Sequence, residues 1–274
     1  MTTAATTAIA RSYLFVPANR PERFAKAHAS GADRVILDLE DAVSEAEKAH
    51  ARRLLAAYLA AGGTGLVRIN ATQTSWFEDD VCIFQKPGVQ GVVLPKAESA
   101  EQIATVLRLL PQDVKVLPLI ETAAGMANVA EIAAASGVER LIFGTVDFRT
   151  ELGIEGDDRE LLFFRSMLVL ASRRAGIASP VDGVTVSISD LEELSAASAR
   201  GRRLGFGAKL CMHPAQVEEV NRAYRPSEAQ VAWAERVMES AKLSPGAFQF
   251  EGEMIDAPVI AKAGDLLRQA GRTQ

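Results

Sequence analysis

The chain has 274 residues, of which 48% are hydrophobic and 24% charged, and its formal net charge is -5. This length and composition are typical of one large globular domain or two small ones, with a core that needs no disulfides. The acidic balance argues against a nucleic-acid partner, which would favour clustered basic residues.

The two cysteines, Cys82 and Cys211, lie far apart and form no CxxC motif. This excludes a disulfide framework and a zinc site, and we expect a reducing, cytoplasmic environment. The stretch "MTTAATTAIA" lacks the basic and long apolar regions of a secretory signal, so residues 1–10 are predicted to be a disordered tail. No window approaches the roughly 18 uncharged apolar residues of a membrane span, so no membrane partner is expected.

Eight short apolar runs rich in Val, Ile and Leu predict eight strands. In chain order they are "YLFVPA" (13–18), "RVILDLE" (34–40), "GLVRIN" (65–70), "GVVLPK" (91–96), "KVLPLIE" (115–121), "RLIFGTVD" (140–147), "VDGVTVSI" (181–188) and "GAKLCMH" (207–213). Ala-rich amphipathic stretches between them predict helices over 44–60, 98–110, 123–136, 158–175 and 190–203.

Alternating strands and helices indicate βαβ units and a parallel sheet, and continuously apolar strands indicate a sheet covered on both faces. Eight units within residues 11–226 fit a (β/α)8 barrel of the TIM type. The alternative is a doubly wound open sheet, which usually shows a glycine-rich phosphate turn after an early strand. No GxGxxG or GxxxxGK[ST] follows any predicted strand, so the barrel is favoured.

Residues 227–274 exceed what eight units require. Ser227 is a predicted N-cap for a helix over 227–243, a Gly- and Pro-rich segment follows over 244–258, and residues 259–271 again have a helical period. We expect C-terminal helices that act as a lid, as an arm to a neighbouring subunit, or as both.

Polar residues stand where the apolar runs stop. In chain order they are Glu40, Asp41, Arg68, Asn70, Lys96, Glu121, Asp147, Lys209 and His213. Active sites of such barrels lie at the C-terminal ends of the strands, so these side chains are expected to converge on one rim.

The second strand ends in three carboxylates, Asp38, Glu40 and Asp41. Strand alternation puts Asp38 and Glu40 on one face, which in a barrel points to the interior and its mouth. The alternative is structural: Asp41 caps the next helix and Glu40 pairs with a lysine.

Glu121 and Asp147 each end an apolar run, on consecutive strands. Two hard oxygen ligands on adjacent strands suit Mg²⁺, which takes one or two carboxylates and keeps several waters. The alternative is that each carboxylate is a helix N-cap.

Two further residues, Arg68 and His213, have two interpretations each. Arg68 could bind a substrate carboxylate bidentately, or pair with Glu40 or Asp41 on the neighbouring strand. His213 could be a base, although a hydrogen bond at the entry of a helix is the more common role of such a histidine. Cys211 lies in an apolar strand and is predicted to be a core thiol.

A series of motifs in a fixed order resembles the citrate lyase β-subunit family, which includes citramalyl-CoA and malyl-CoA lyases. The motifs are "RSYLFVPANRPERFAKAHASGADRVILDLEDAV" (11–43), "VRIN" (67–70), "LPKAES" (94–99), "IETAAG" (120–125), "FGTVDF" (143–148), "KLCMHPAQ" (209–216), "AYRPS" (223–227) and "FEGEMIDAPV" (250–259). The resemblance covers nearly the whole chain from Arg11 to about residue 270.

The resemblance implies a (β/α)8 barrel, a Mg²⁺-dependent carbon–carbon lyase and a homotrimer. It further implies that Glu121 binds metal and substrate, that Asp147 is the second metal ligand, and that Arg68 holds the carboxylate of the oxo or hydroxy acid. Glu40 and Asp41 would orient waters on the metal. Asp256 would act in proton transfer from a lid that reaches a neighbouring active site.

At "FGTVDF" the chain departs from the family pattern. Many relatives have an acidic residue where this chain has Val146, and Arg149 follows closely. Both differences bear on substrate identity more than on metal binding.

The implied reaction is retro-Claisen or retro-aldol cleavage of a 3-hydroxy-3-carboxy acyl thioester to a 2-oxo acid and an acyl thioester such as acetyl-CoA. Citramalyl-CoA is slightly favoured over malyl-CoA and a citryl thioester, and either CoA or an acyl carrier could bear the thioester. A malate synthase-like condensing enzyme, a malyl-CoA thioesterase and an aldolase acting on free hydroxy acids remain alternatives. A non-catalytic protein that binds a 2-oxo acid on the same scaffold is an alternative from another class.

Overall fold

The computed structural model describes residues 10–243 and 246–272, and it divides into two compact units. The larger unit spans residues 10–223 and the smaller one begins at Tyr224. The tail predicted over residues 1–10 falls, apart from Ala10, outside the described residues.

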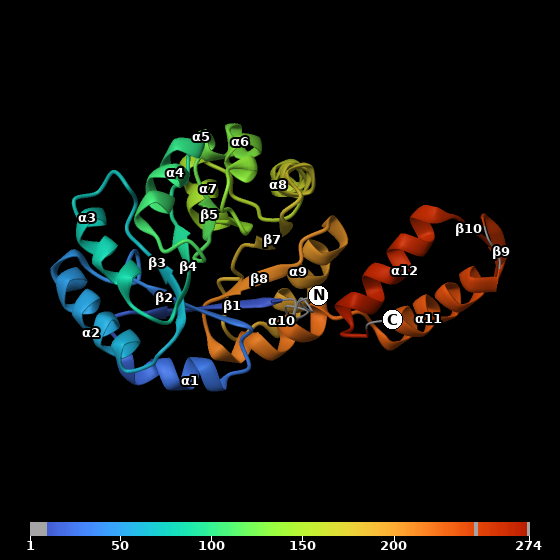
Figure 1. The fold of residues 1–274 in the computed structure, drawn as a ribbon, viewed down its shortest axis with the longest axis horizontal. Helices are drawn as coiled ribbons and strands as arrows, with labels where there is room; N and C mark the ends of the chain where they lie inside the picture. Colours follow the sequence, from blue (N-terminus) through green and yellow to red (C-terminus); the bar gives the residue numbers. More distant parts are fainter. Residues whose placement is uncertain (1–9, 244–245, 273–274) are drawn as a thin grey trace. The chain divides into compact units, whose positions relative to one another are not determined.

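The larger unit is a closed barrel of eight parallel strands in sequential order, with β8 paired to β1 (Figure 1). The strands are β1 Ser12–Pro17, β2 Arg34–Asp38, β3 Gly65–Arg68, β4 Val89–Leu94, β5 Val116–Ile120, β6 Arg140–Phe143, β7 Ala178–Asp182 and β8 Ala208–Cys211. The predicted (β/α)8 barrel is therefore confirmed.

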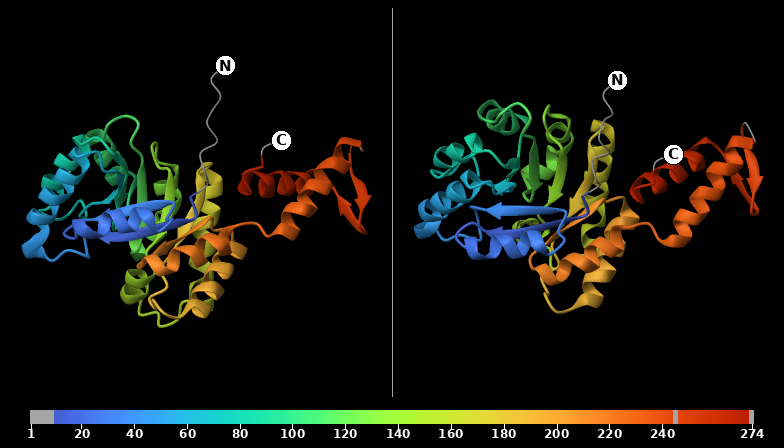
Figure 2. Two further views of the ribbon diagram at one scale, coloured as in Figure 1. Left: turned by 90° about the horizontal axis from the view of Figure 1, so that it is seen from below. Right: turned by 60° about the horizontal axis from the view of Figure 1, so that its bottom comes forward.

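Helices surround the barrel on its outside, as the views in Figures 1 and 2 show. The α-helices are α1 Phe24–Ala29, α2 Lys48–Ala60, α3 Phe77–Asp80, α4 Ala100–Leu109, α5 Ala123–Ala127, α6 Val129–Ala134, α7 Thr145–Leu152, α8 Leu162–Ala175, α9 Leu191–Leu204 and α10 Val217–Tyr224, whose last residue begins the smaller unit. Short 3₁₀ helices span Pro21–Arg23, Glu45–Glu47, Val81–Gln85, Arg159–Leu161 and Pro214–Gln216.

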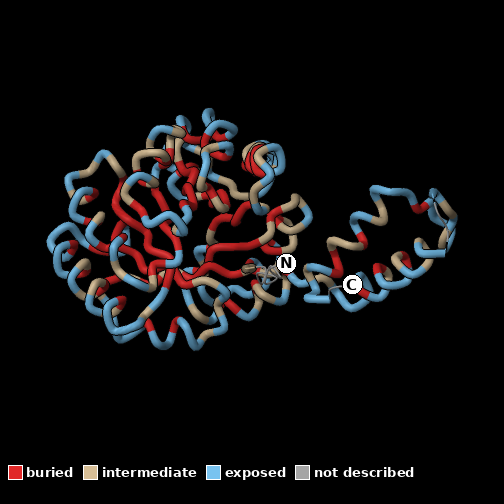
Figure 3. The backbone as a smooth tube through the Cα atoms, in the orientation of Figure 1, coloured by how far each residue is buried: buried red, intermediate tan, exposed pale blue. Residues whose placement is uncertain are grey.

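The barrel core is a single cluster to which every strand contributes an apolar side chain. Its buried members are Tyr13, Ile36, Leu66, Val93, Leu117, Leu119, Ile142, Val181, Ala208 and Leu210. Figure 3 shows the buried strands at the centre of this unit. Because alternate residues of a strand point to opposite faces, the neighbours of these residues pack outward against the helices.

A buried arginine lies at the N-terminal end of β6, in the same unit. Arg140 donates from Nη1 to the carbonyl of Ala10 and to the Tyr13 hydroxyl, and its guanidinium lies 5.5 Å from the Tyr13 ring. Gly207 leaves room for it, since a Cβ there would lie 2.5 Å from Arg140 Nη2.

All eight predicted strands differ from the observed ones at one end or both, and two of them differ by more than two residues. The run over 140–147 stops being a strand at Phe143, because Gly144 turns the chain and helix α7 begins at Thr145. The run over 181–188 is a strand only to Asp182, and β7 starts earlier, at Ala178. The sequence does not indicate this start, because Pro180 lacks the backbone N–H that a strand residue donates to its neighbour. Its carbonyl nevertheless accepts a hydrogen bond from Gly207 N at 3.0 Å.

The smaller unit contains a helical hairpin closed by a two-stranded antiparallel ribbon. Its elements are α11 Glu228–Leu243, β9 Phe248–Phe250, β10 Glu253–Ile255 and α12 Ala257–Gln269. Ser227 accepts from Gln230 N at 3.2 Å, so its predicted capping role is confirmed. A separate apolar cluster that includes Val237, Ile255 and Ala263 holds this unit together.

Within residues 10–243 and 246–272, no helix combines the length and the apolar character that crossing a membrane requires.

Candidate active site

Three charged side chains extend the inward faces of their strands beyond the apolar core. Asp38 follows Ile36 by two residues, Arg68 follows Leu66, and Glu121 follows Leu119. Since residues two apart share a strand face, these groups lie at the C-terminal mouth of the barrel. All three are buried, so charge is concentrated where contact with water is restricted.

Arg68 is held by Asp38, its direct partner in the β2–β3 register. Arg68 Nε donates to Asp38 Oδ1 at 2.7 Å and Nη2 donates to Oδ2 at 2.5 Å, a bidentate pair. The Phe15 ring lies 4.7 Å from the guanidinium carbon. Burial alone would lower the pKa of Arg68, but the carboxylates of Asp38, Glu40 and Asp41 raise it by more.

The remaining edge of Arg68 faces Glu40 and Asp41. Nη1 lies 2.9 Å from Glu40 Oε2 and 3.6 Å from Asp41 Oδ2. Arg68 therefore does pair with Glu40 and Asp41, as the structural alternative predicts. Its principal partner is Asp38, which the sequence analysis did not single out. A substrate carboxylate at this edge would compete with both side chains.

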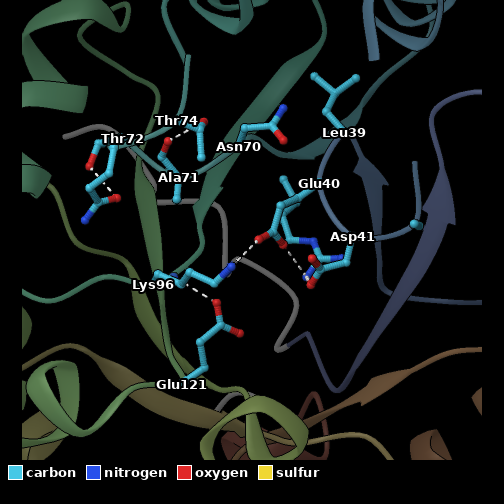
Figure 4. Close-up of polar contacts among 12 residues, drawn as sticks. Leu39, Glu40, Asp41, Asn70, Ala71, Thr72, Thr74, Lys96 and Glu121 are labelled. Atoms are coloured by element: carbon cyan, nitrogen blue, oxygen red, sulfur yellow. Dashed lines mark hydrogen bonds and ion pairs between the residues drawn. The ribbon is translucent and has the colours of Figure 1, made fainter. Parts of the chain in front are cut away.

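Glu40 is buried between two cations. Its Oε1 lies 3.4 Å from Lys96 Nζ, so the predicted pairing with a lysine is confirmed (Figure 4). Burial raises the pKa of Glu40 to about 7; Arg68 and Lys96 oppose this rise, and Asp41 and Asp38 add to it. Glu40 is thus placed to exchange a proton near neutral pH.

Asp41 does not cap the next helix, contrary to the structural alternative. Its side chain is 57% exposed, and the cap position of the following 3₁₀ helix belongs to Ser44. The loop is instead held from inside by Asp38, which accepts from Glu40 N at 2.9 Å and from Ala42 N at 3.3 Å. This turn directs Glu40 into the mouth.

Lys48 fixes the same loop from the other side, and the sequence reasoning missed it. Its Nζ donates to the carbonyls of Leu39 and Glu40, both at 3.0 Å, and lies 5.0 Å from the Trp76 ring. Burial lowers the pKa of Lys48. The available signal was helical spacing, since Lys48 shares the buried stripe of α2 with Ala51, Leu55 and Leu59.

Glu121 is buried directly after β5. Its Oε1 accepts from the backbone N of Lys96 at 2.8 Å (Figure 4). Burial raises the pKa of Glu121 to about 8, with Glu40 and Asp147 adding to the rise and the Lys96 hydrogen bond and Arg68 opposing it. Glu121 is not an N-cap, because Thr122 caps helix α5 by accepting from Gly125 N.

Gly144 makes room for the Glu121 carboxylate. A Cβ at position 144 would lie 2.5 Å from Glu121 Cβ and 2.6 Å from Oε2, so any side chain there would displace the Glu121 carboxylate. This explains the glycine between β6 and α7, and it shows that Oε2 borders the end of β6.

Asp147 does not end a strand, contrary to the prediction. It lies in the first turn of α7 and is exposed, and the N-cap position of that helix is Gly144. Its charge nevertheless raises the pKa of Glu121. Nearby, Arg149 donates to the carbonyls of Thr145 and Glu155.

Two other predicted rim residues, Asn70 and Lys209, have structural contacts. Asn70 donates from Nδ2 to the fully buried Asp80 at 2.7 Å, and Lys209 donates to the carbonyl of Gly183 at 2.6 Å. Lys209 alternates with Ala208 and Leu210 of the core, so it faces outward and away from the mouth.

His213 accepts from Ala215 N at 3.2 Å at the start of a 3₁₀ helix, so the helix-entry interpretation is confirmed. Cys211 is fully buried, as predicted for a core thiol, and burial raises its pKa to about 12.

Asp256 belongs to the smaller unit. It is the N-cap of α12, where its Oδ1 accepts from Val259 N at 3.3 Å, and it is exposed. A role in proton transfer stays a prediction.

The mouth contains five carboxylates, namely Asp38, Glu40, Asp41, Glu121 and Asp147, against the cations Arg68 and Lys96. Among the described residues no set of three or more His, Cys, Asp and Glu side chains is arranged to hold a metal. The carboxylate oxygens of the mouth are hard, acidic donors, which suit a cation such as Mg²⁺ that takes one or two carboxylates and keeps water or substrate oxygens as its other ligands.

Residues 11–214 match the family model described as HpcH/HpaI aldolase/citrate lyase. The chain belongs to this family. The resemblance to citrate lyase β-subunits noted from the motifs is thereby confirmed, and the family is one of aldolases and lyases.

Relatives within the family differ in activity. A "Citrate lyase subunit beta-like protein" of Mycobacterium tuberculosis is 41% identical over 266 residues, covering 94% of this chain and 95% of that protein. A (3S)-malyl-CoA thioesterase of Cereibacter sphaeroides is 35% identical over 270 residues, covering 95% and 94%. The crystal structure of protein CitE from M. tuberculosis in complex with magnesium, acetoacetate and coenzyme A has a TM-score of 0.84 and 39% identity, covering 97% and 100%.

Proposed function

We propose that this protein is a Mg²⁺-dependent carbon–carbon lyase that cleaves a 3-hydroxy-3-carboxy acyl thioester to a 2-oxo acid and an acyl thioester such as acetyl-CoA. The observation that carries the proposal is Glu121. It is a buried carboxylate whose Oε1 is already hydrogen-bonded and whose Oε2 borders Gly144 without a hydrogen-bond partner among the described residues.

Glu121 and Asp147 are the proposed metal ligands. Both supply hard oxygen atoms, and the excess of carboxylates at the mouth favours a dication there. Bound Mg²⁺ would polarise the hydroxyl and carboxylate oxygens of the substrate and orient them. The M. tuberculosis CitE complex contains magnesium, which supports Mg²⁺ as the cation.

Arg68 is the proposed anchor for the substrate carboxylate. Asp38 fixes two of its nitrogens, so the guanidinium is pre-oriented and only the Nη1 edge faces Glu40 and Asp41. Binding of a carboxylate at this edge would release Glu40 from its ion pair. Glu40 and Asp41 would then orient waters around the metal, as the resemblance implies.

The reaction proceeds by proton transfer and bond cleavage. A base takes the proton of the C3 hydroxyl, for which Glu40 is the candidate because its pKa is raised to about 7. The C2–C3 bond breaks, its electron pair goes to C2 as the thioester enolate, and C3 becomes the carbonyl of the 2-oxo acid. An acid then protonates C2, and Asp256 of the smaller unit is the candidate.

The lid and the assembly belong to the same proposal. We expect residues 227–274 to close over the thioester, and a homotrimer in which Asp256 serves a neighbouring site. The CoA in the M. tuberculosis CitE complex supports a CoA thioester over an acyl-carrier thioester. Citramalyl-CoA is the first substrate to test, followed by malyl-CoA and citryl-CoA.

A second candidate function is hydrolysis of malyl-CoA. The 35% identity to (3S)-malyl-CoA thioesterase over nearly the whole chain favours it. Free CoA and an intact hydroxy acid would be its products, whereas the lyase yields an acyl-CoA and a 2-oxo acid.

Turnover of a panel of CoA thioesters tests the proposal. Citramalyl-, malyl-, citryl- and methylmalyl-CoA are assayed with Mg²⁺ and with EDTA, beside Glu121→Ala and a control, Glu131→Ala, at an exposed position of α6. A lyase gives a 2-oxo acid only with Mg²⁺ and Glu121. Binding of a 2-oxo acid without turnover of any thioester would instead indicate the non-catalytic alternative.

A further inference from the structure

Two non-glycine residues among those described have a left-handed backbone, Lys96 with φ 46° and Glu251 with φ 50°. Side chains disfavour this region, so each such residue is held there by its surroundings. Glu251 is followed by Gly252, also at positive φ, in the tight turn between β9 and β10, which accounts for its conformation. Lys96 lies in the loop after β4, at the barrel mouth, where no such hairpin requires it.

The left-handed turn at Lys96 aims a backbone donor at Glu121. Lys96 N–H donates to Glu121 Oε1 at 2.8 Å, and the next residue continues the link because Ala97 N donates to the carbonyl of Leu119 at 3.3 Å. The loop after β4 is thereby tied to the end of β5 at two points, the Glu121 carboxylate and the Leu119 carbonyl. Gly125 permits this approach, since a Cβ there would lie 2.4 Å from the Ala97 carbonyl oxygen.

The same contact leaves the two oxygens of Glu121 inequivalent. Oε1 is occupied, and Oε2 faces the gap kept open by Gly144. A carboxylate restrained in this way presents one oxygen in one direction. Hydrogen bonds from neighbouring groups commonly orient metal ligands in proteins in this manner.

We propose that Lys96 is a positioning residue whose left-handed backbone orients Glu121 so that Oε2 alone is presented to the cation. The inference rests on the proposed function, because it assigns Glu121 as a metal ligand. The proposed role belongs to the backbone N–H of Lys96. The positive charge of its side chain, which is what the sequence shows, is not needed for it.

The side chain of Lys96 has a separate partner. Its ammonium lies 3.4 Å from Glu40 Oε1, and the side chain is 48% exposed. Removing the side chain therefore alters the environment of Glu40 and keeps the N–H that reaches Glu121. Backbone and side-chain roles can be distinguished by substitution.

The test is a series of neutral residues at position 96 that differ in their tolerance of the left-handed region. Glycine and asparagine adopt it readily, alanine less so, and a β-branched valine least. All four variants lose the same positive charge, so any general electrostatic effect on cation binding is common to them. Asn and Val form the decisive pair, because they differ strongly in their tolerance of the left-handed region.

Mg²⁺ binding to the whole chain is measured by calorimetry, with substrate absent. We expect Lys96→Gly and Lys96→Asn to bind Mg²⁺ at least as tightly as the parent, and Lys96→Val to bind about tenfold more weakly than Lys96→Asn. Lys96→Ala should fall between them, so the order remains readable even if the valine variant does not fold. Circular dichroism and thermal unfolding report on folding.

Glu251 supplies the matched control. Glu251→Asn and Glu251→Val impose the same contrast on the other left-handed residue, which lies in the β9–β10 turn of the smaller unit. They should differ from each other in unfolding temperature and share the Mg²⁺ affinity of the parent.

Equal Mg²⁺ affinity of Lys96→Asn and Lys96→Val, or weaker binding by all four neutral variants alike, would overturn the inference. Absence of Mg²⁺ binding by the parent would overturn both the inference and the metal assignment. The expected order of affinities in a protein that cleaves no thioester would support the positioning role and overturn only the lyase function.

Discussion

Arg68 and Asp38 form a buried bidentate ion pair between adjacent strands, 2.7 and 2.5 Å in length, at the point where the barrel core becomes the barrel mouth. The pair links β2, which leads into Glu40, to β3. It thus couples the stability of the barrel to the orientation of the charged groups above it.

Removing Asp38 should destabilise the protein strongly. Asp38→Ala leaves two nitrogens of a buried guanidinium and two backbone donors without their partner, and we expect a loss of about 3–5 kcal/mol in the free energy of unfolding. Urea denaturation measures this loss. Asp79→Ala is the control: it removes a 68% exposed partner of Arg52 and should cost less than about 1 kcal/mol. Equal losses would contradict the importance of the Asp38 pair.

The pH dependence of stability should report Glu121. Its folded pKa of about 8 lies above the ordinary glutamate value of 4.5, so the folded state holds the proton more tightly than the unfolded state. The contribution of Glu121 to the free energy of unfolding is therefore fully present below about pH 4.5 and is lost as the pH rises through about 8. Glu40, with a pKa of about 7, adds the same trend.

Glu121→Gln removes the Glu121 part of this dependence. In EDTA, its free energy of unfolding should exceed that of the parent by on the order of a few kcal/mol at about pH 8.5, and the gap should narrow at about pH 5.5. Urea unfolding at both pH values measures it. A gap that does not change with pH would show that Glu121 titrates normally.

Lys48 should act on catalysis through Glu40. Lys48→Met keeps the length of the side chain but leaves the carbonyls of Leu39 and Glu40 without their donor. We expect a loss of about 1–3 kcal/mol in stability and a lower kcat, with Mg²⁺ affinity preserved. Denaturation, steady-state kinetics and calorimetry measure the three quantities. Unchanged kcat would mean that Glu40 is held in place without Lys48.

Gly144 should be required for metal binding. Gly144→Ala puts a methyl group within 2.6 Å of Glu121 Oε2, so the carboxylate must move and Mg²⁺ affinity should fall at least about tenfold. Gly264→Ala, in helix α12, has only Arg268 Nη1 at 3.6 Å from the new Cβ and serves as the control. It should leave Mg²⁺ binding intact, and calorimetry compares the two variants.

Asp256 has a capping role that must be separated from the proposed proton transfer. Asp256→Ser keeps a capping oxygen for α12 but removes the acid, whereas Asp256→Ala removes both. We expect both variants to lose thioester cleavage and to retain Mg²⁺ binding, with only Asp256→Ala costing about 1 kcal/mol in stability. Cleavage by Asp256→Ser at the parent's rate would assign Asp256 to the cap alone.

Several elements of the site were predictable from local pattern. The apolar runs that build β2, β3 and β5 end in Asp38, Arg68 and Glu121, and strand alternation alone carries each of these residues onto the inward face. The ends of β6 and β7 were not predictable in this way. Gly144 and Pro180 interrupt local propensity, so the strand bounds there depend on pairing with neighbouring strands.

The sequence by itself determined the barrel and the acidic, oxygen-rich character of its C-terminal ends, because period-two and helical patterns are local properties of the chain. The tertiary structure decided which charges meet. Arg68 and Asp38 are 30 positions apart, and Lys96 and Glu121 are 25 apart. Local pattern cannot specify such contacts, since each depends on strand register, on the left-handed turn at Lys96 and on the space that Gly144 leaves beside the carboxylate.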